Sequence, residues 1–82
     1  MKNFFYSNLK YLRKYKGMSQ QEIADKIGID RSSISRWENG DMGATIDKAI
    51  DIAQLFDIPI SKFLYKDLSL NDRENKVWTV IH

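Results

Sequence analysis

The 82-residue sequence has no cysteine, a single histidine and no long apolar run, and each shortage excludes a class of function. Without cysteine there can be no disulfide, no thiolate metal site and no cysteine nucleophile. The histidine is the last residue, His82, which is a poor position for a metal ligand or a general base. No stretch approaches the ~18 consecutive apolar residues of a membrane-spanning helix. We therefore expect no metal, no cofactor and no membrane segment.

The remaining composition is that of a small globular protein. Hydrophobic residues make up 43% and charged residues 29%, both ordinary values. A chain of this size can bury one small core but cannot also hold a deep substrate cleft. It carries no nucleophile–base pair and no glycine-rich phosphate loop, so we expect no enzyme. The absence of cysteine and of an apolar signal segment favours a cytoplasmic location.

Apolar residues recur at helical spacing, which predicts an all-α fold of five helices. The predicted helices cover residues 3–16, 19–27, 30–39, 45–56 and 60–65. Ser19 and Glu22 have the S-x-x-E spacing of a capping box, and Asp30 and Thr45 are predicted N-caps. Gly28 is predicted to end the second helix in the left-handed conformation. The buried stripe of the fourth helix is predicted to contain Ile46, Ala49, Ile50, Ala53 and Phe56.

The C-terminal part of the chain has a different pattern. We expect residues 1–66 to form the helical domain and residues 67–82 to form a short extension. Within the extension, the segment KVWTVI (76–81) is rich in β-branched and aromatic residues, which predicts a strand. A single strand has no partner inside an all-helical domain. It must pair with a second copy of the chain, fold over the helices or stay loose.

The predicted helix 30–39 has two chemically different faces. At ~100° per residue, five polar side chains fall within an arc of about 140°, with Ile34 and Trp37 on the far side. The residues of this arc are Arg31, Ser32, Ser35, Arg36 and Asn39, and Asp30 and Glu38 flank it. The arc contains no acidic residue, whereas an ordinary solvated face mixes both charges. Arginine can bind guanine O6 and N7 together, and serine can bond to several base edges, so this face favours insertion into the DNA major groove. The predicted base-contacting residues are Arg31, Ser32, Ser35 and Arg36.

Other polar residues are placed to bind the DNA backbone. Asn39 follows the predicted third helix, and Ser19 and Gln20 lie at the start of the second, where backbone N–H groups also favour phosphate. We expect loss of Gln20 to weaken binding to all DNA sequences alike. The competing interpretation of all these residues is a solvated polar surface.

Residues 18–40, MSQQEIADKIGIDRSSISRWENG, resemble the helix-turn-helix of phage repressors and Cro-like (Xre-type) regulators. SQQEIADKIGI matches that family's first helix and turn, and the run from Ser32 to Gly40 matches the end of its recognition helix. The resemblance extends over residues 8–64 and implies a compact lambda-repressor-like DNA-binding domain.

The resemblance also implies roles for individual residues. Gln20 would bind phosphate and could also contact the first base. Asn39 would bind the backbone, and Arg31, Ser32 and Arg36 would face bases, with Ser35 contributing. Arg13 and Glu38 match a salt bridge that ties the first helix to the third. The family's loop after Gly40 is often basic, but here it is Asp41-Met42-Gly43-Ala44. Phosphate contacts there are expected from backbone amides and Thr45, with Lys48 as a further candidate.

The sequence therefore predicts a sequence-specific regulator of transcription, expected to be a repressor, that binds double-stranded DNA as a homodimer. Either strand 76–81 or the end of the fifth helix, with Phe63, Leu64 and Tyr65, would form the dimer contact. The alternative is an antitoxin-type interaction module with autoregulatory DNA binding, in which residues 69–82 bind a protein partner. The chain could also be part of a longer regulator, with residues 69–75 starting a linker.

Overall fold

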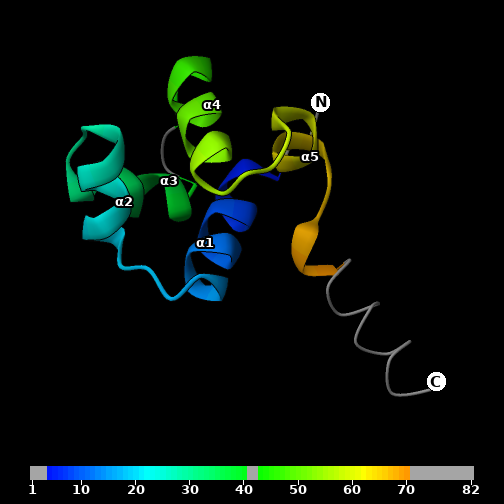
Figure 1. Ribbon diagram of the computed structural model, residues 1–82, viewed down its shortest axis with the longest axis horizontal. Coiled ribbons are helices and arrows are strands. Elements are labelled where there is room, and N and C mark those ends of the chain that lie inside the picture. Colours follow the sequence, from blue (N-terminus) through cyan, green and yellow to red (C-terminus); the bar gives the residue numbers. More distant parts are fainter. Residues whose placement is uncertain (1–3, 41–42, 71–82) are drawn as a thin grey trace.

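The computed structural model describes residues 4–40 and 43–70, and within these ranges it contains helices and no strand (Figure 1). The helices are α1 (Phe5–Tyr15), α2 (Gln20–Ile27), α3 (Arg31–Glu38), α4 (Ile46–Leu55) and α5 (Ile60–Tyr65). The prediction of an all-α, five-helix domain is confirmed, and residues 68–70 add a short helical segment. The predicted strand 76–81 lies outside the described residues. Among those described, no helix is both long and apolar enough to span a bilayer.

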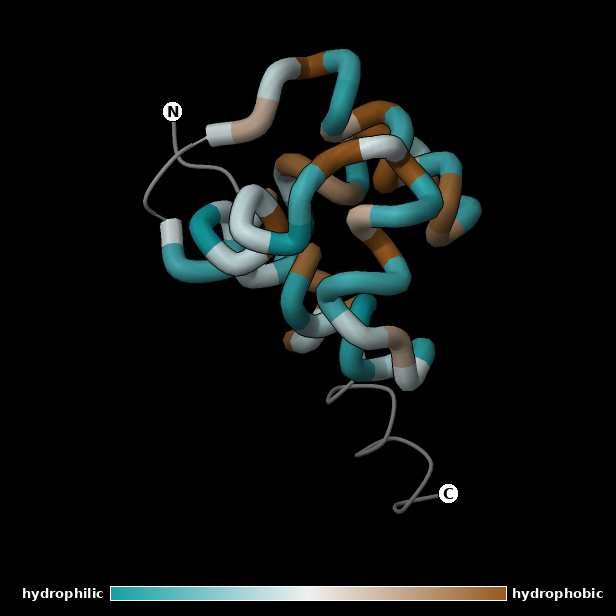
Figure 2. Tube along the Cα trace, turned by 90° about the vertical axis from the view of Figure 1, so that its left-hand side faces the viewer, coloured by the Kyte–Doolittle hydropathy of each residue, from teal (hydrophilic) through white to brown (hydrophobic). Residues whose placement is uncertain are grey.

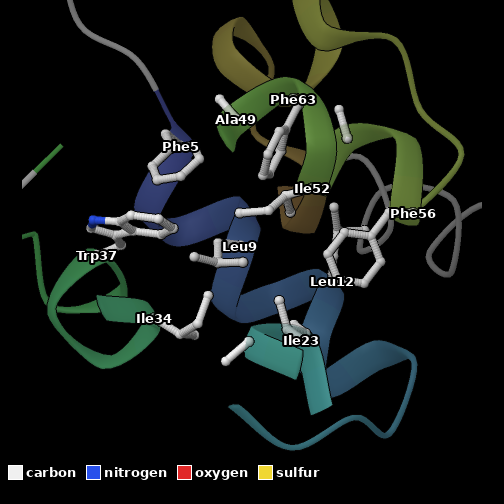
Figure 3. Packing of buried hydrophobic residues seen from close by; sticks show 12 residues of the cluster. Phe5, Leu9, Leu12, Ile23, Ile34, Trp37, Ala49, Ile52, Phe56 and Phe63 are labelled. Carbon is white, nitrogen blue, oxygen red and sulfur yellow. The ribbon is translucent and has the colours of Figure 1, made fainter. Parts of the chain in front are cut away.

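One apolar core joins all five helices (Figure 3). Its buried residues are Phe5, Leu9, Leu12, Ile23, Ala24, Ile34, Trp37, Ala49, Ile52, Ala53, Phe56 and Phe63. The Phe5 ring lies between α3 and α5, with centroid distances of 6.1 Å to Trp37 and 5.3 Å to Phe63. Figure 2 shows hydrophobic and hydrophilic residues alternating along the trace, as expected for helices with one buried and one exposed face. The core therefore fixes which face of α3 points outward.

Local capping sets the start of α2 and of α4. The Ser19 hydroxyl accepts a hydrogen bond from the Glu22 amide (3.0 Å), and the Glu22 carboxylate accepts one from the Ser19 amide (2.9 Å), which confirms the predicted capping box. Thr45 caps α4 by accepting from the Lys48 amide. Asp30 occupies the N-cap position of α3, but its side chain makes no capping hydrogen bond, so that part of the prediction is wrong.

The predicted buried stripe of α4 is partly wrong. Ile46 is 59% exposed, and the buried positions of the helix are Ala49, Ile52 and Ala53, while Ile50 is half-buried. Ile46 is the first residue of α4, directly after the Thr45 cap. Ile46 has the helical spacing of a buried residue, but the core does not extend far enough to cover its side chain at this end of α4.

Asp57 adopts a left-handed conformation (φ 57°) where the chain leaves α4. This conformation costs an L-residue about 1–2 kcal/mol, whereas glycine adopts it freely. Replacing Asp57 with glycine is therefore expected to raise the free energy of unfolding by about 0.5–1 kcal/mol, measured by urea denaturation. The same change at Asp47, inside α4, should lower it. A loss of stability at both positions would show that Asp57 is not strained.

Candidate nucleic-acid interface

An ion pair behind the predicted DNA-binding surface ties α1 to the last turn of α3. Arg13 donates to both carboxylate oxygens of Glu38, from Nε at 2.6 Å and from Nη2 at 3.0 Å. It also donates to the Met18 carbonyl at 3.0 Å. The two side chains are only 13% and 3% exposed. Hydrogen bonding to Glu38 raises the pKa of Arg13 in spite of desolvation, so the guanidinium stays charged.

The predicted base-contacting residues lie on the outward face of α3. Arg31, Ser32 and Arg36 are exposed and Ser35 is half-buried, while Ile34 and Trp37 point into the core (Figure 3). The residue that follows the helix, Asn39, is also exposed. The structure thus gathers the predicted arc on one accessible surface, with its orientation set by the apolar side of the same helix.

The two hydroxyl groups that are predicted to bind phosphate can still donate a hydrogen bond. Ser19 and Thr45 are both exposed, and each uses its hydroxyl oxygen to accept a capping hydrogen bond. A hydroxyl group also carries one hydrogen, and this hydrogen is still available to donate when the oxygen accepts the capping bond. Each of these groups can therefore stabilise its own helix and donate to a phosphate oxygen at the same time.

Gln20 is partly enclosed by other polar side chains. It is half-buried, its Nε2 donates to Glu38 Oε1 at 3.2 Å, and its Oε1 accepts from Arg31 Nη1 at 3.4 Å. No local sequence pattern predicts this link, because Gln20 belongs to α2 while Glu38 and Arg31 belong to α3. Ser33 is not among the predicted site residues, but its hydroxyl lies 3.5 Å from Arg36 Nη2. The i, i+3 spacing of Ser33 and Arg36 on one helix could have indicated this contact.

Lys48, the further candidate for phosphate, has two partners within the domain. Its ammonium group donates to the Ile27 carbonyl at 3.2 Å and lies 3.9 Å from the Asp51 carboxylate. A cation at this position stabilises the negative end of α2. The lysine therefore links α4 to α2, and its contact with phosphate stays a prediction. Across residues 4–40 and 43–70, no three acidic, histidine or cysteine side chains are grouped so as to hold a metal ion.

Two short helices joined at Gly28 (φ 75°), the second with an outward polar face and an apolar back, define a helix-turn-helix protein. Comparison with known families agrees, since the helix-turn-helix family matches residues 9–63. The chain belongs to the Cro/C1-type helix-turn-helix family of DNA-binding transcriptional regulators.

Two curated relatives contain a similar segment. A putative HTH-type transcriptional regulatory protein of Pyrococcus furiosus is 39% identical over 54 residues, which cover 66% of this chain and 17% of that protein. The antitoxin PezA of Streptococcus pneumoniae is 35% identical over 68 residues, which cover 83% of this chain and 43% of PezA. The chain thus spans less than half of the length of either relative.

A solved structure with the same fold is that of the restriction-modification controller protein C.AhdI from Aeromonas hydrophila. It superposes with a TM-score of 0.67 and 30% sequence identity, covering 72% of this chain and 89% of that one. The similarity therefore includes nearly the whole controller protein.

Proposed function

We propose that this chain recognises a specific double-stranded DNA sequence by placing α3 in the major groove, and that it regulates transcription in this way. The observation that carries the proposal is the outward polar arc of α3, which contains Arg31 and Arg36 and no acidic side chain. A hydrogen-bonding face held rigidly from behind is what direct base recognition requires. Family membership and the regulator from Pyrococcus furiosus support the proposal.

Backbone contacts would set the register of α3 on the duplex. The Ser19 and Thr45 hydroxyls, the Asn39 amide and the amino ends of α2 and α4 supply donors suited to phosphate oxygens. These contacts do not depend on sequence, so they add affinity without discrimination. Binding of this kind needs no metal, cofactor or covalent step, and we propose no enzymatic activity.

We propose that two copies bind one operator as a homodimer. A single α3 can contact only a few base pairs, and a dimer doubles the site, with half-sites ~34 Å apart. Phe63 cannot contact a second copy of the chain, because its side chain is fully buried and packs against Phe5. On α5, Tyr65 (54% exposed) and half-buried Leu64 remain for this role. Repression is the proposed outcome, since a dimer seated on an operator excludes other proteins from it.

The proposal is tested by selecting binding sites from random duplex DNA with the purified chain. We expect enrichment of one sequence with two related half-sites in inverted orientation. Unselective binding in buffer of low ionic strength would overturn the proposal, because the phosphate contacts would then account for all the affinity.

Replacing Arg36 with alanine is expected to weaken binding to the selected site by about 1–3 kcal/mol and to relax the preference at one base pair. The matched control is Lys62→Ala, which removes one exposed positive charge from α5 and should leave the base preference unchanged. Both variants can be measured by fluorescence anisotropy. Unchanged affinity of Arg36→Ala for every sequence would exclude a base-contacting role.

An antitoxin-type function is the second candidate, and the similarity to the antitoxin PezA favours it. Figure 1 shows residues 68–70 (orange) at the end of the molecule away from α2 and α3. A protein partner that binds the chain at this end would leave the polar arc of α3 free for DNA. A stoichiometric protein partner that is lost on deletion of residues 69–82 would support this function. A chain that binds its operator with no such partner would support the first.

A further inference from the structure

A shallow apolar groove lies where the start of α1 meets the start of α4 and the end of α5. Its volume is about 200 Å³, and its apolar lining comes from Phe5, Tyr6, Ala44, Ile46, Ala49 and Leu64. Ile46 is 59% exposed and Tyr6 is 38% exposed, so the packed helices leave this side of the domain open. Adjacent apolar side chains that stay open to water mark a surface that another segment or molecule covers.

The same chain carries an apolar segment beyond the described residues. After Leu70 the sequence continues with the polar run NDREN (71–75) and then with KVWTVI (76–81). Four of the six residues in the second run are apolar, and one of them is Trp78. Burial of one large aromatic side chain removes about 150–250 Å² from water, so this segment gains most from an apolar site. The polar run before it has no such side chain and is suited to serve as a tether.

The described chain ends close enough to the groove for this segment to return to it. Leu64 lines the groove, and Leu70 follows it by six residues, while Asn8 of α1 holds the Leu68 amide between them (3.1 Å). Six residues span at most about 20–22 Å when fully extended, so Leu64 and Leu70 lie within that distance of each other. The next six residues, from Leu70 to position 76, have the same maximum span. The chain can therefore bring 76–81 back to the groove of the same molecule.

We propose that residues 76–81 dock in this groove of their own molecule, with Trp78 as the main buried side chain. A second copy of the chain is the competing source of the same segment. A tether of five residues (71–75) gives the segment an effective concentration of ~mM at its own groove, so the contact within one molecule forms first in dilute solution. Tyr65, which is 54% exposed, lies outside the groove lining and stays available for a contact between copies. Docking of this segment requires no DNA.

Tryptophan fluorescence of the full chain tests this docking. Trp37 is buried in the core and also emits, so the difference between the wild type and Trp78→Phe gives the emission of Trp78. We expect this emission at a shorter wavelength than that of a free indole such as N-acetyltryptophanamide, with quenching by acrylamide reduced several-fold. Both effects should be independent of protein concentration in the micromolar range, far below the ~mM effective concentration of the tethered segment.

Two matched variants, each paired with its own Trp78→Phe reference, connect the protection of Trp78 to the groove. Ile46→Asp places a carboxylate in the groove lining and should return the Trp78 emission to that of a free indole. Ile46 is already 59% exposed and begins α4, where a negative charge is favourable, so the domain should stay folded. Tyr15→Asp makes the same change of charge at a side chain that is 65% exposed and lies outside the groove lining, and it should leave Trp78 protected. Circular dichroism checks that both variants are folded.

Four outcomes would overturn the proposed docking. Acrylamide could quench Trp78 as strongly as a free indole, which would leave the groove open for another protein. Protection of Trp78 could increase with protein concentration, which would make a second copy the source of the segment. Protection could persist in Ile46→Asp, which would place Trp78 elsewhere on the domain. Protection could be lost in Tyr15→Asp as well, which would show a general effect of added negative charge.

Discussion

Replacing Glu38 with alanine is expected to lower the free energy of unfolding by about 3–5 kcal/mol, the cost of breaking one buried ion pair. The Glu38 carboxylate accepts two hydrogen bonds from Arg13 and one from Gln20. Its loss would leave the guanidinium of Arg13, only 13% exposed, with the Met18 carbonyl as its remaining partner. Since small domains are stable by only about 5–15 kcal/mol, this variant should be close to unfolding.

Urea denaturation followed by circular dichroism measures this loss. Asp25→Ala is the matched control, because it removes an exposed carboxylate and should change stability by less than about 0.5 kcal/mol. The double variant Arg13→Met, Glu38→Met should recover much of the loss, since it leaves no buried charge without a partner. Equal stability of Glu38→Ala and Asp25→Ala would show that the ion pair does not stabilise the fold.

Replacing Asn8 with alanine is expected to cost about 3 kcal/mol, because three buried or half-buried backbone groups would lose their partner. Asn8 has no exposed surface. Its Nδ2 donates to the carbonyls of Phe63 (2.7 Å) and Lys66 (2.6 Å), and its Oδ1 accepts from the Leu68 amide (3.1 Å). The carbonyls at the end of a helix have no partner within that helix, so this single side chain caps the end of α5.

Equilibrium denaturation and amide hydrogen exchange test this prediction. Besides the loss of stability, the Leu68 amide should exchange faster in Asn8→Ala. Ser7→Ala is the control, since the neighbouring hydroxyl is exposed and donates only to the Phe4 carbonyl. Asn8→Asp should be worse than Asn8→Ala, because its carboxylate would face two carbonyl oxygens. A loss no larger than that of Ser7→Ala would show that Asn8 does not hold α5 to α1.

The sequence alone determined the helices and the polar face of α3. The predicted range of 60–65 is the observed range of α5, and the capping box at Ser19 marks the start of α2. Both predictions succeed because helical period and capping depend on residues at most four positions apart. The arc from Arg31 to Asn39 follows from the same geometry, since one helix carries all of its members.

The tertiary structure alone decided how the helices support that face. Gln20 meets Glu38 across 18 positions of sequence, and Asn8 meets Leu68 across 60. The Lys48 ammonium group donates to the carbonyl of Ile27 at the end of α2, and the side chain of Ile46 lies outside the core. No local pattern could predict these outcomes, because a hydrogen bond between helices depends on where packing of the whole core places each one. The sequence thus determined which polar side chains share one face of α3, and the packing determined which side chains of other helices support that face.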